Sequence, residues 1–158
     1  MDRSSGPWVV AGFAAALDLA LVVFAFGFAS LLVDADVVAE SGVGILVVPA
    51  AIGASVAAVL VVLGFRLRRP DRMAGTVVLT AAGAWLSLVL VATLARLLDS
   101  TGPALASAAF GLGFGIGWFG LLVPAIAALV ASLAVLVARG RAEGMDRPRW
   151  PWERDDDE

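Results

Sequence analysis

The chain has 158 residues, of which 61% are hydrophobic, and its mean hydropathy is +0.95. This composition excludes a soluble globular core and indicates one compact membrane domain. The formal net charge is −3, but the four acids from Asp155 to Glu158 supply much of the negative charge, so the sum says little about the rest of the chain.

The missing residue types exclude several kinds of chemistry. The sequence has no Cys and no His, and neither Lys nor Tyr occurs in it. Disulfides, Ser–His or Cys–His nucleophile pairs, Schiff bases and haem ligation by His, Cys or Tyr are therefore ruled out. We expect no enzymatic activity, no cofactor and no metal site. Nucleic-acid binding is also disfavoured, because no folded basic surface is predicted.

The first predicted element is a membrane-spanning helix over residues 8–33 that carries one charge, Asp18, near its middle. Helical periodicity gives this run a face of small residues that includes the acid, opposite a face of bulky apolar residues. Small residues in lipid mark where helices approach closely, so we expect Asp18 to point into a bundle. The small face comprises Ala11, Ala15, Asp18, Val22, Ala25 and Ala29, and the bulky face Phe13, Leu17, Ala20, Phe24, Phe28 and Leu31.

Asp18 is the candidate functional residue, and two interpretations of it stay open. A carboxylate at mid-bilayer costs about 2.5–3.5 kcal/mol on insertion scales, so a mid-membrane acid is a functional candidate by default. It can equally be a protonated acid that holds the bundle together through a hydrogen bond to a neighbouring helix. The candidate polar neighbours are Ser55, Thr80 and Ser87, whose hydroxyls can accept from or donate to it.

The second span is predicted over residues 43–65, with Pro49 about two turns in, where it is expected to kink the helix. The third span is predicted over residues 73–98. It carries a small polar stripe formed by Thr76, Thr80, Gly83 and Ser87. This stripe is both the natural neighbour for Asp18 and the pattern of an ordinary contact between helices.

The fourth apolar stretch, residues 103–138, is too long for one span. A helix of about 36 residues would measure ~54 Å, against a hydrocarbon core of ~30 Å. We expect a break within residues 111–120, a segment at the outer surface or re-entrant over 104–115, and a span over 116–138 kinked near Pro124. Alternating glycines could expose backbone groups to an ion, or serve as GxxxG helix contacts. The glycines concerned are Gly111, Gly113, Gly115 and Gly117.

Residues 139–158 are predicted to form a polar, disordered cytoplasmic tail. Arginine gathers in the loop between spans two and three and at the start of this tail, which puts both termini in the cytoplasm by the positive-inside rule. Interleaved Trp and Arg in the tail suit the lipid interface as well as a solvated segment.

The four short-looped spans and the tail RPRWPWERDDDE resemble small four-span membrane proteins of high-GC Gram-positive bacteria. That resemblance is architectural and implies no particular activity. The chain is also similar to small multidrug-resistance transporters, which are compact four-span proteins with an acid in the first helix, matched here by Asp18. Theirs is a Glu, and this chain is longer, so the transport role implied for Asp18 is a hypothesis.

The sequence therefore predicts an all-α, four-helix bundle in the cytoplasmic membrane. The expected function is a structural or accessory one, with the lipid bilayer as environment and a second copy or another membrane protein as partner. The alternative is a proton-coupled small-molecule transporter or channel that uses Asp18.

Overall fold

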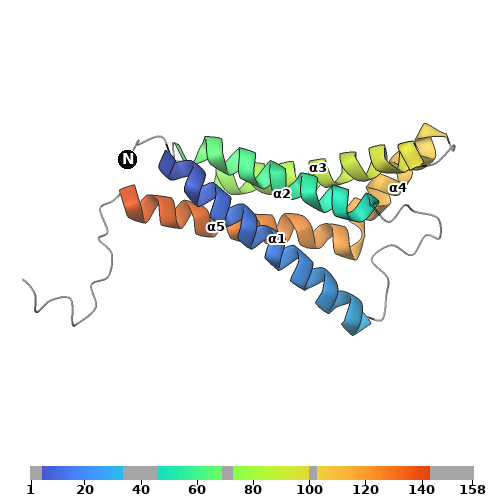
Figure 1. Ribbon diagram of the computed structural model, residues 1–158, viewed down its shortest axis with the longest axis horizontal. Coiled ribbons are helices and arrows are strands. Elements are labelled where there is room, and N and C mark those ends of the chain that lie inside the picture. The colour runs from blue at the N-terminus through green and yellow to red at the C-terminus, as the bar shows by residue number, and fades with distance from the viewer. Residues whose placement is uncertain (1–4, 34–45, 69–72, 100–102, 143–158) are drawn as a thin grey trace, which may run out of the picture.

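The computed structural model describes residues 5–33, 46–68, 73–99 and 103–142, and every regular element among them is a helix. Four of these helices, all except α4, are long and apolar enough to cross a membrane. The prediction of an all-α membrane bundle is confirmed. The helices are α1 (Ser5–Val33), α2 (Val47–Arg66), α3 (Met73–Asp99), α4 (Ala104–Ile116) and α5 (Trp118–Ala142), shown in Figure 1.

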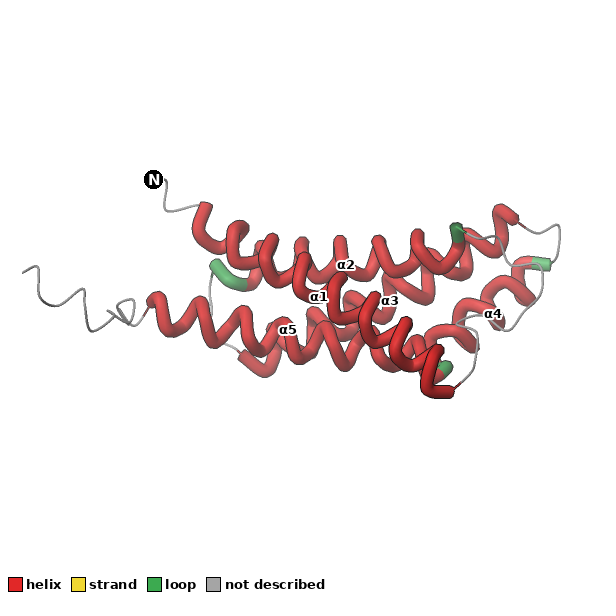
Figure 2. The backbone as a smooth tube through the Cα atoms, turned by 60° about the horizontal axis from the view of Figure 1, so that its bottom comes forward, coloured by secondary structure: helices red, strands yellow, loops and turns green. Residues whose placement is uncertain are grey.

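The four long helices surround one core. α1 packs against α2 and α5, and α3 packs against the same two helices from the other side, while α2 and α5 also touch each other. Figure 1 shows the start of α1 and the end of α5 at one end of the bundle. Figure 2 shows α4 at the opposite end, where α3 ends. Within the described residues α1 and α3 are therefore diagonal partners rather than neighbours.

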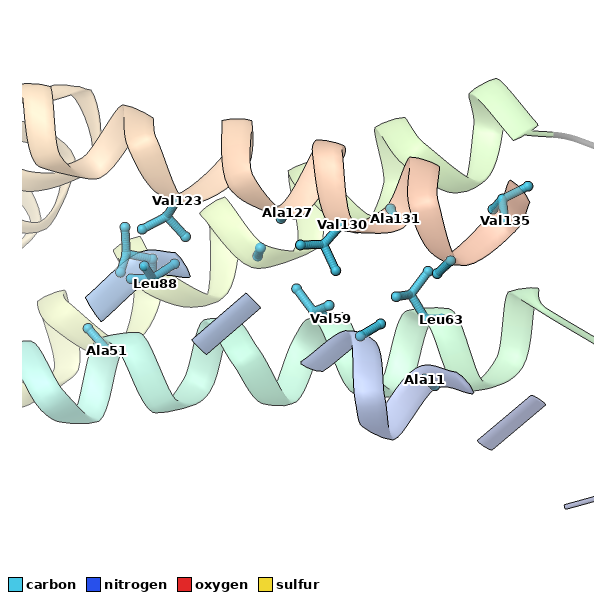
Figure 3. Packing of buried hydrophobic residues seen from close by; sticks show 14 of the residues in the cluster. Ala11, Ala51, Val59, Leu63, Leu88, Val123, Ala127, Val130, Ala131 and Val135 are labelled. Carbon is cyan, nitrogen blue, oxygen red and sulfur yellow. The ribbon is translucent and has the colours of Figure 1, made fainter. Parts of the chain in front are cut away.

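Medium and small side chains fill this core from all four helices. Figure 3 shows Val59 and Leu63 of α2 close to Val130 of α5, and all three are at most 1% exposed. Lipid tails are as apolar as these side chains, so burial from water does not drive the helices together here. Close packing and the dispersion energy that it brings stabilise the assembled bundle.

The burial of α1 follows the two faces that its periodicity predicts. Ala11 and Val22 on the small face are fully buried, whereas Phe13 and Leu31 on the bulky face are 76% and 84% exposed. Large apolar side chains can contact acyl chains without cost, so this exposure is expected in a bilayer. The predicted orientation of Asp18 into the bundle is confirmed by its 0% exposure.

Two helix boundaries correct the sequence-based picture. α2 begins at Val47, so Pro49 lies in its first turn, where the missing N–H has no intrahelical acceptor to lose. The expected kink at Pro49 is therefore wrong. α5 continues to Ala142, so Arg139 and Arg141 extend the last helix instead of opening a polar tail. The rest of the predicted tail, residues 143–158, lies outside the described residues.

Candidate functional site

The carboxyl group of Asp18 is enclosed at the middle of α1. The residue is 0% exposed, and neither carboxyl oxygen has a hydrogen-bond partner within the described part of the chain. The side chain is therefore closed to solvent in this arrangement. Leaving a buried polar group unpaired costs about 1–3 kcal/mol. Asp18 thus has the burial of a core residue together with the unmet hydrogen-bonding capacity of a functional one.

The three hydroxyls expected near Asp18 are engaged within their own helices. Ser55 Oγ donates to the carbonyl oxygen of Ile52 at 2.8 Å, and Thr80 Oγ1 donates to that of Thr76 at 2.8 Å. Ser87 Oγ donates to the carbonyl oxygen of Ala84 at 2.9 Å. In lipid, such bonds to the preceding turn satisfy a hydroxyl without a partner helix. The structure therefore forms no hydrogen bond from any of the three to Asp18.

The polar stripe of α3 is largely buried, and its Gly83 lies against α2. Thr76 and Thr80 are at most 2% exposed, and a Cβ added at Gly83 would lie 3.6 Å from a methyl carbon of Val62 on α2. α1 does not pack helix-to-helix on α3 in the described structure, and no hydroxyl of the stripe forms a hydrogen bond with Asp18. Of the two interpretations of the stripe, this geometry supports the ordinary helix contact.

The glycine run divides into residues with different roles. Ser107, Gly111 and Gly115 form the buried face of α4. A Cβ at Gly111 would collide with the Thr93 side chain, and one at Gly115 with Val89, both on α3. Trp85 Nε1 donates to the carbonyl oxygen of Gly115 at 2.9 Å, which fixes α4 along the second half of α3. Gly111 and Gly115 are thus a close helix contact of the GxxxG kind.

The second glycine pair does not make such a contact. A Cβ at Gly113 would meet nothing within 4 Å, and Gly117 ends α4, with its N–H donating to the carbonyl oxygen of Gly113 at 2.9 Å. The expected helix contact through Gly113 and Gly117 is therefore wrong within the described chain. The sequence places the break within residues 111–120, and in the structure it lies at Gly117, whose ψ of 162° is extended. Pro124 lies inside α5, where it lacks the N–H that would bond to Gly120.

One cluster of aromatic and basic side chains was not predicted from the sequence. It lies at the end of the bundle that contains the start of α1. The Trp8 ring packs edge-to-face on Phe65 with centroids 5.6 Å apart, and it covers Gly64. The guanidinium carbon of Arg68 lies 6.0 Å from the Trp8 ring centroid and 5.5 Å from that of Phe65. Trp and Arg in this combination are typical of the membrane interface. A Trp at the start of one span and Arg just after the next would have signalled it.

Comparisons with known proteins identify the family and nothing finer. The chain belongs to a family of unknown function, DUF6121, whose model matches residues 1–158. No curated protein and no solved structure matches the chain. Within the described residues no group of three or more acidic side chains is placed to hold a metal ion. Any functional proposal therefore depends on the geometry of this chain alone.

Proposed function

We propose that this member of the family is a non-enzymatic protein of the cytoplasmic membrane with a structural or accessory role. The observation that carries this proposal is the closed core around Asp18, which has no exposed surface in the middle of a packed bundle. A transport pathway needs a route for its cargo to the functional group, and a fully packed carboxyl lacks one in this arrangement. Association with a second copy or another membrane protein would then use the outer faces of the helices.

We further propose that both termini lie in the cytoplasm. The described charged side chains at the end of the bundle that contains Trp8 are Arg66, Arg68, Arg139 and Arg141, all cations. The positive-inside rule directs such an end to the cytoplasm.

Cysteine labelling measures this orientation directly, because the chain has no Cys. We expect a cysteine at Ser41 to react with a membrane-impermeant maleimide in intact cells. A cysteine at Arg68 should react only after the membrane is opened. The reverse pattern would contradict the proposed orientation, and equal labelling of both sites in intact cells would contradict a sealed, single topology.

A second candidate function, proton-coupled transport of a small molecule, is favoured by one observation. Both Asp18 oxygens lack a hydrogen-bond partner within the described residues. An acid retained without a structural bond is what a proton carrier requires, since a carrier must exchange its proton with a pathway. In this hypothesis the structure corresponds to an occluded state, and another arrangement opens the core to one side of the membrane.

Proton flux into proteoliposomes separates the two functions. Purified wild type and Asp18→Asn are reconstituted at equal density with a pH-sensitive dye inside, and flux is followed after a pH step, with and without a panel of lipophilic cations. For a structural or accessory protein we expect both variants to match empty liposomes. Flux above that level in wild type that is lost in Asp18→Asn would overturn the structural proposal and establish the carrier. Circular dichroism of both samples verifies equal folding.

A further inference from the structure

A groove on the outside of the bundle runs between α1 and α5. It has a volume of about 270 Å³ and is open to the surroundings along part of its length. Nine of the ten lining residues are apolar, and the tenth is Arg141. The α1 side is formed by Val9, Val10, Phe13, Ala14 and Leu17, and the α5 side by Val130, Leu133, Ala134, Val137 and Arg141.

The groove has the length of one leaflet of a bilayer. From Val130 to Arg141 the rise of α5 is about 16 Å, and half of a hydrocarbon core is about 15 Å. Arg141 lies at the end of the bundle where Trp8, Phe65 and Arg68 form the interfacial cluster, since Val9 lines the same groove. The apolar part of the groove therefore lies at acyl depth, and its charged end lies at headgroup depth.

The charge at this end selects the chemistry of the occupant. Arg141 is exposed and, within the described chain, is the one charged residue that lines the groove, so its guanidinium favours an anionic group at this end. Guanidinium binds phosphate oxygens in a bidentate manner and is well suited to a phosphodiester. A hydrocarbon chain is thin enough to enter this groove, whereas a helix about 10 Å across would rest on its rim.

We propose that this groove is a binding site for one anionic phospholipid, with an acyl chain between α1 and α5 and the headgroup phosphate on Arg141. The site depends on the protein being embedded in a membrane but not on the role of Asp18. Failure of the lipid site and failure of the proposed function are therefore separate results. Bound lipid would fill the outer surface directly beside Ala14 and Leu17, next to the helix segment that carries Asp18.

Native mass spectrometry of the detergent-purified full chain tests the charged end. The probes are phosphatidylglycerol and phosphatidylcholine with identical acyl chains. We expect phosphatidylglycerol to bind about three- to tenfold more tightly, the range for an exposed charge-assisted contact. Arg141→Gln should remove this preference, and Arg66→Gln, an exposed arginine at the same end but outside the groove, should retain it. Equal loss of the preference for phosphatidylglycerol in Arg141→Gln and Arg66→Gln would contradict the proposed lipid site.

The apolar part is tested by filling the groove. Val137→Phe places a ring among the lining residues, whereas Leu136→Phe adds the same ring to an exposed position that does not line the groove. We expect weaker binding of both lipids only in Val137→Phe. Photo-crosslinking of wild type with a diazirine-labelled acyl chain of phosphatidylglycerol supplies a measurement without substitution. Labels on residues 9–17 and 130–137 support the site, and labels confined to other helices overturn it.

Discussion

Replacing Gly120 by alanine is expected to destabilise the bundle by about 1–3 kcal/mol, the usual cost of forcing atoms into a packed site. A Cβ at this position would lie 2.7 Å from both the Cα and the carbonyl oxygen of Gly115, and it would also collide with the carbonyl oxygen of Phe114. These are backbone atoms of the preceding helix, so no side-chain rotation can relieve the contact. The start of α5 would have to move away from the end of α4.

Gly113→Ala is the matched control for this substitution, because it adds the same methyl group four residues before the break. A Cβ there would meet nothing within 4 Å, and Gly113 lies within α4. Alanine in the interior of a helix is favoured over glycine by about 0.5–1 kcal/mol, so this variant should be neutral or more stable. Thermal unfolding in detergent, followed by circular dichroism, measures both. Equal midpoints for the two variants would mean that α4 and α5 do not pack closely at Gly117.

It is easier to predict from the sequence which residues of a helix are buried than to predict which other helix covers them. The period of 3.6 residues on α1 separates small from bulky residues, and this alone identifies Asp18 as inward-facing. The same pattern does not reveal the partner helix. α1 packs against α5, at the far end of the described chain, where the Phe26 ring lies edge-to-face on Phe119. It does not pack helix-to-helix on α3, which carries the Thr80 stripe. The hydrogen bonds expected from Thr80 and Ser87 of α3 to Asp18 are not formed, because both hydroxyls donate to carbonyl oxygens of their own helix.

Local ambiguity explains the other differences. Gly111/Gly115 and Gly113/Gly117 have identical spacing, and only the side on which α3 lies makes the first pair a contact. Whether Pro49 bends a helix depends on where α2 begins, and helix boundaries carry errors of a few residues in any sequence-based assignment. The groove that ends in Arg141 has no signature at all in the sequence. It is formed by side chains of two helices, α1 and α5, that are distant in the sequence.

Asp18→Val is expected to stabilise the bundle by about 1–3 kcal/mol, the cost of leaving a buried polar group unpaired. Both carboxyl oxygens are enclosed without hydrogen bonds among the described residues, so an apolar side chain of similar size removes a cost without breaking a bond. Asp18→Asn keeps the shape and the unpaired polar atoms, and its stability should lie within about 1 kcal/mol of wild type. Thermal unfolding in detergent, with circular dichroism as the signal, ranks the three proteins.

Val22→Asp is the control in the opposite direction, because Val22 lies one turn further along the same fully buried face. A second enclosed acid at that position should destabilise the protein. If Asp18→Val instead lowers the unfolding midpoint, the carboxyl group forms a hydrogen bond that stabilises the bundle. The absence of a hydrogen-bond partner for Asp18 would then be contradicted. A variant that is more stable than wild type but loses Asp18-dependent proton flux would show that the acid is retained for function at the expense of stability. Higher stability with no change in flux would instead leave the outer faces of the helices and the α1–α5 groove as the surfaces on which the protein acts.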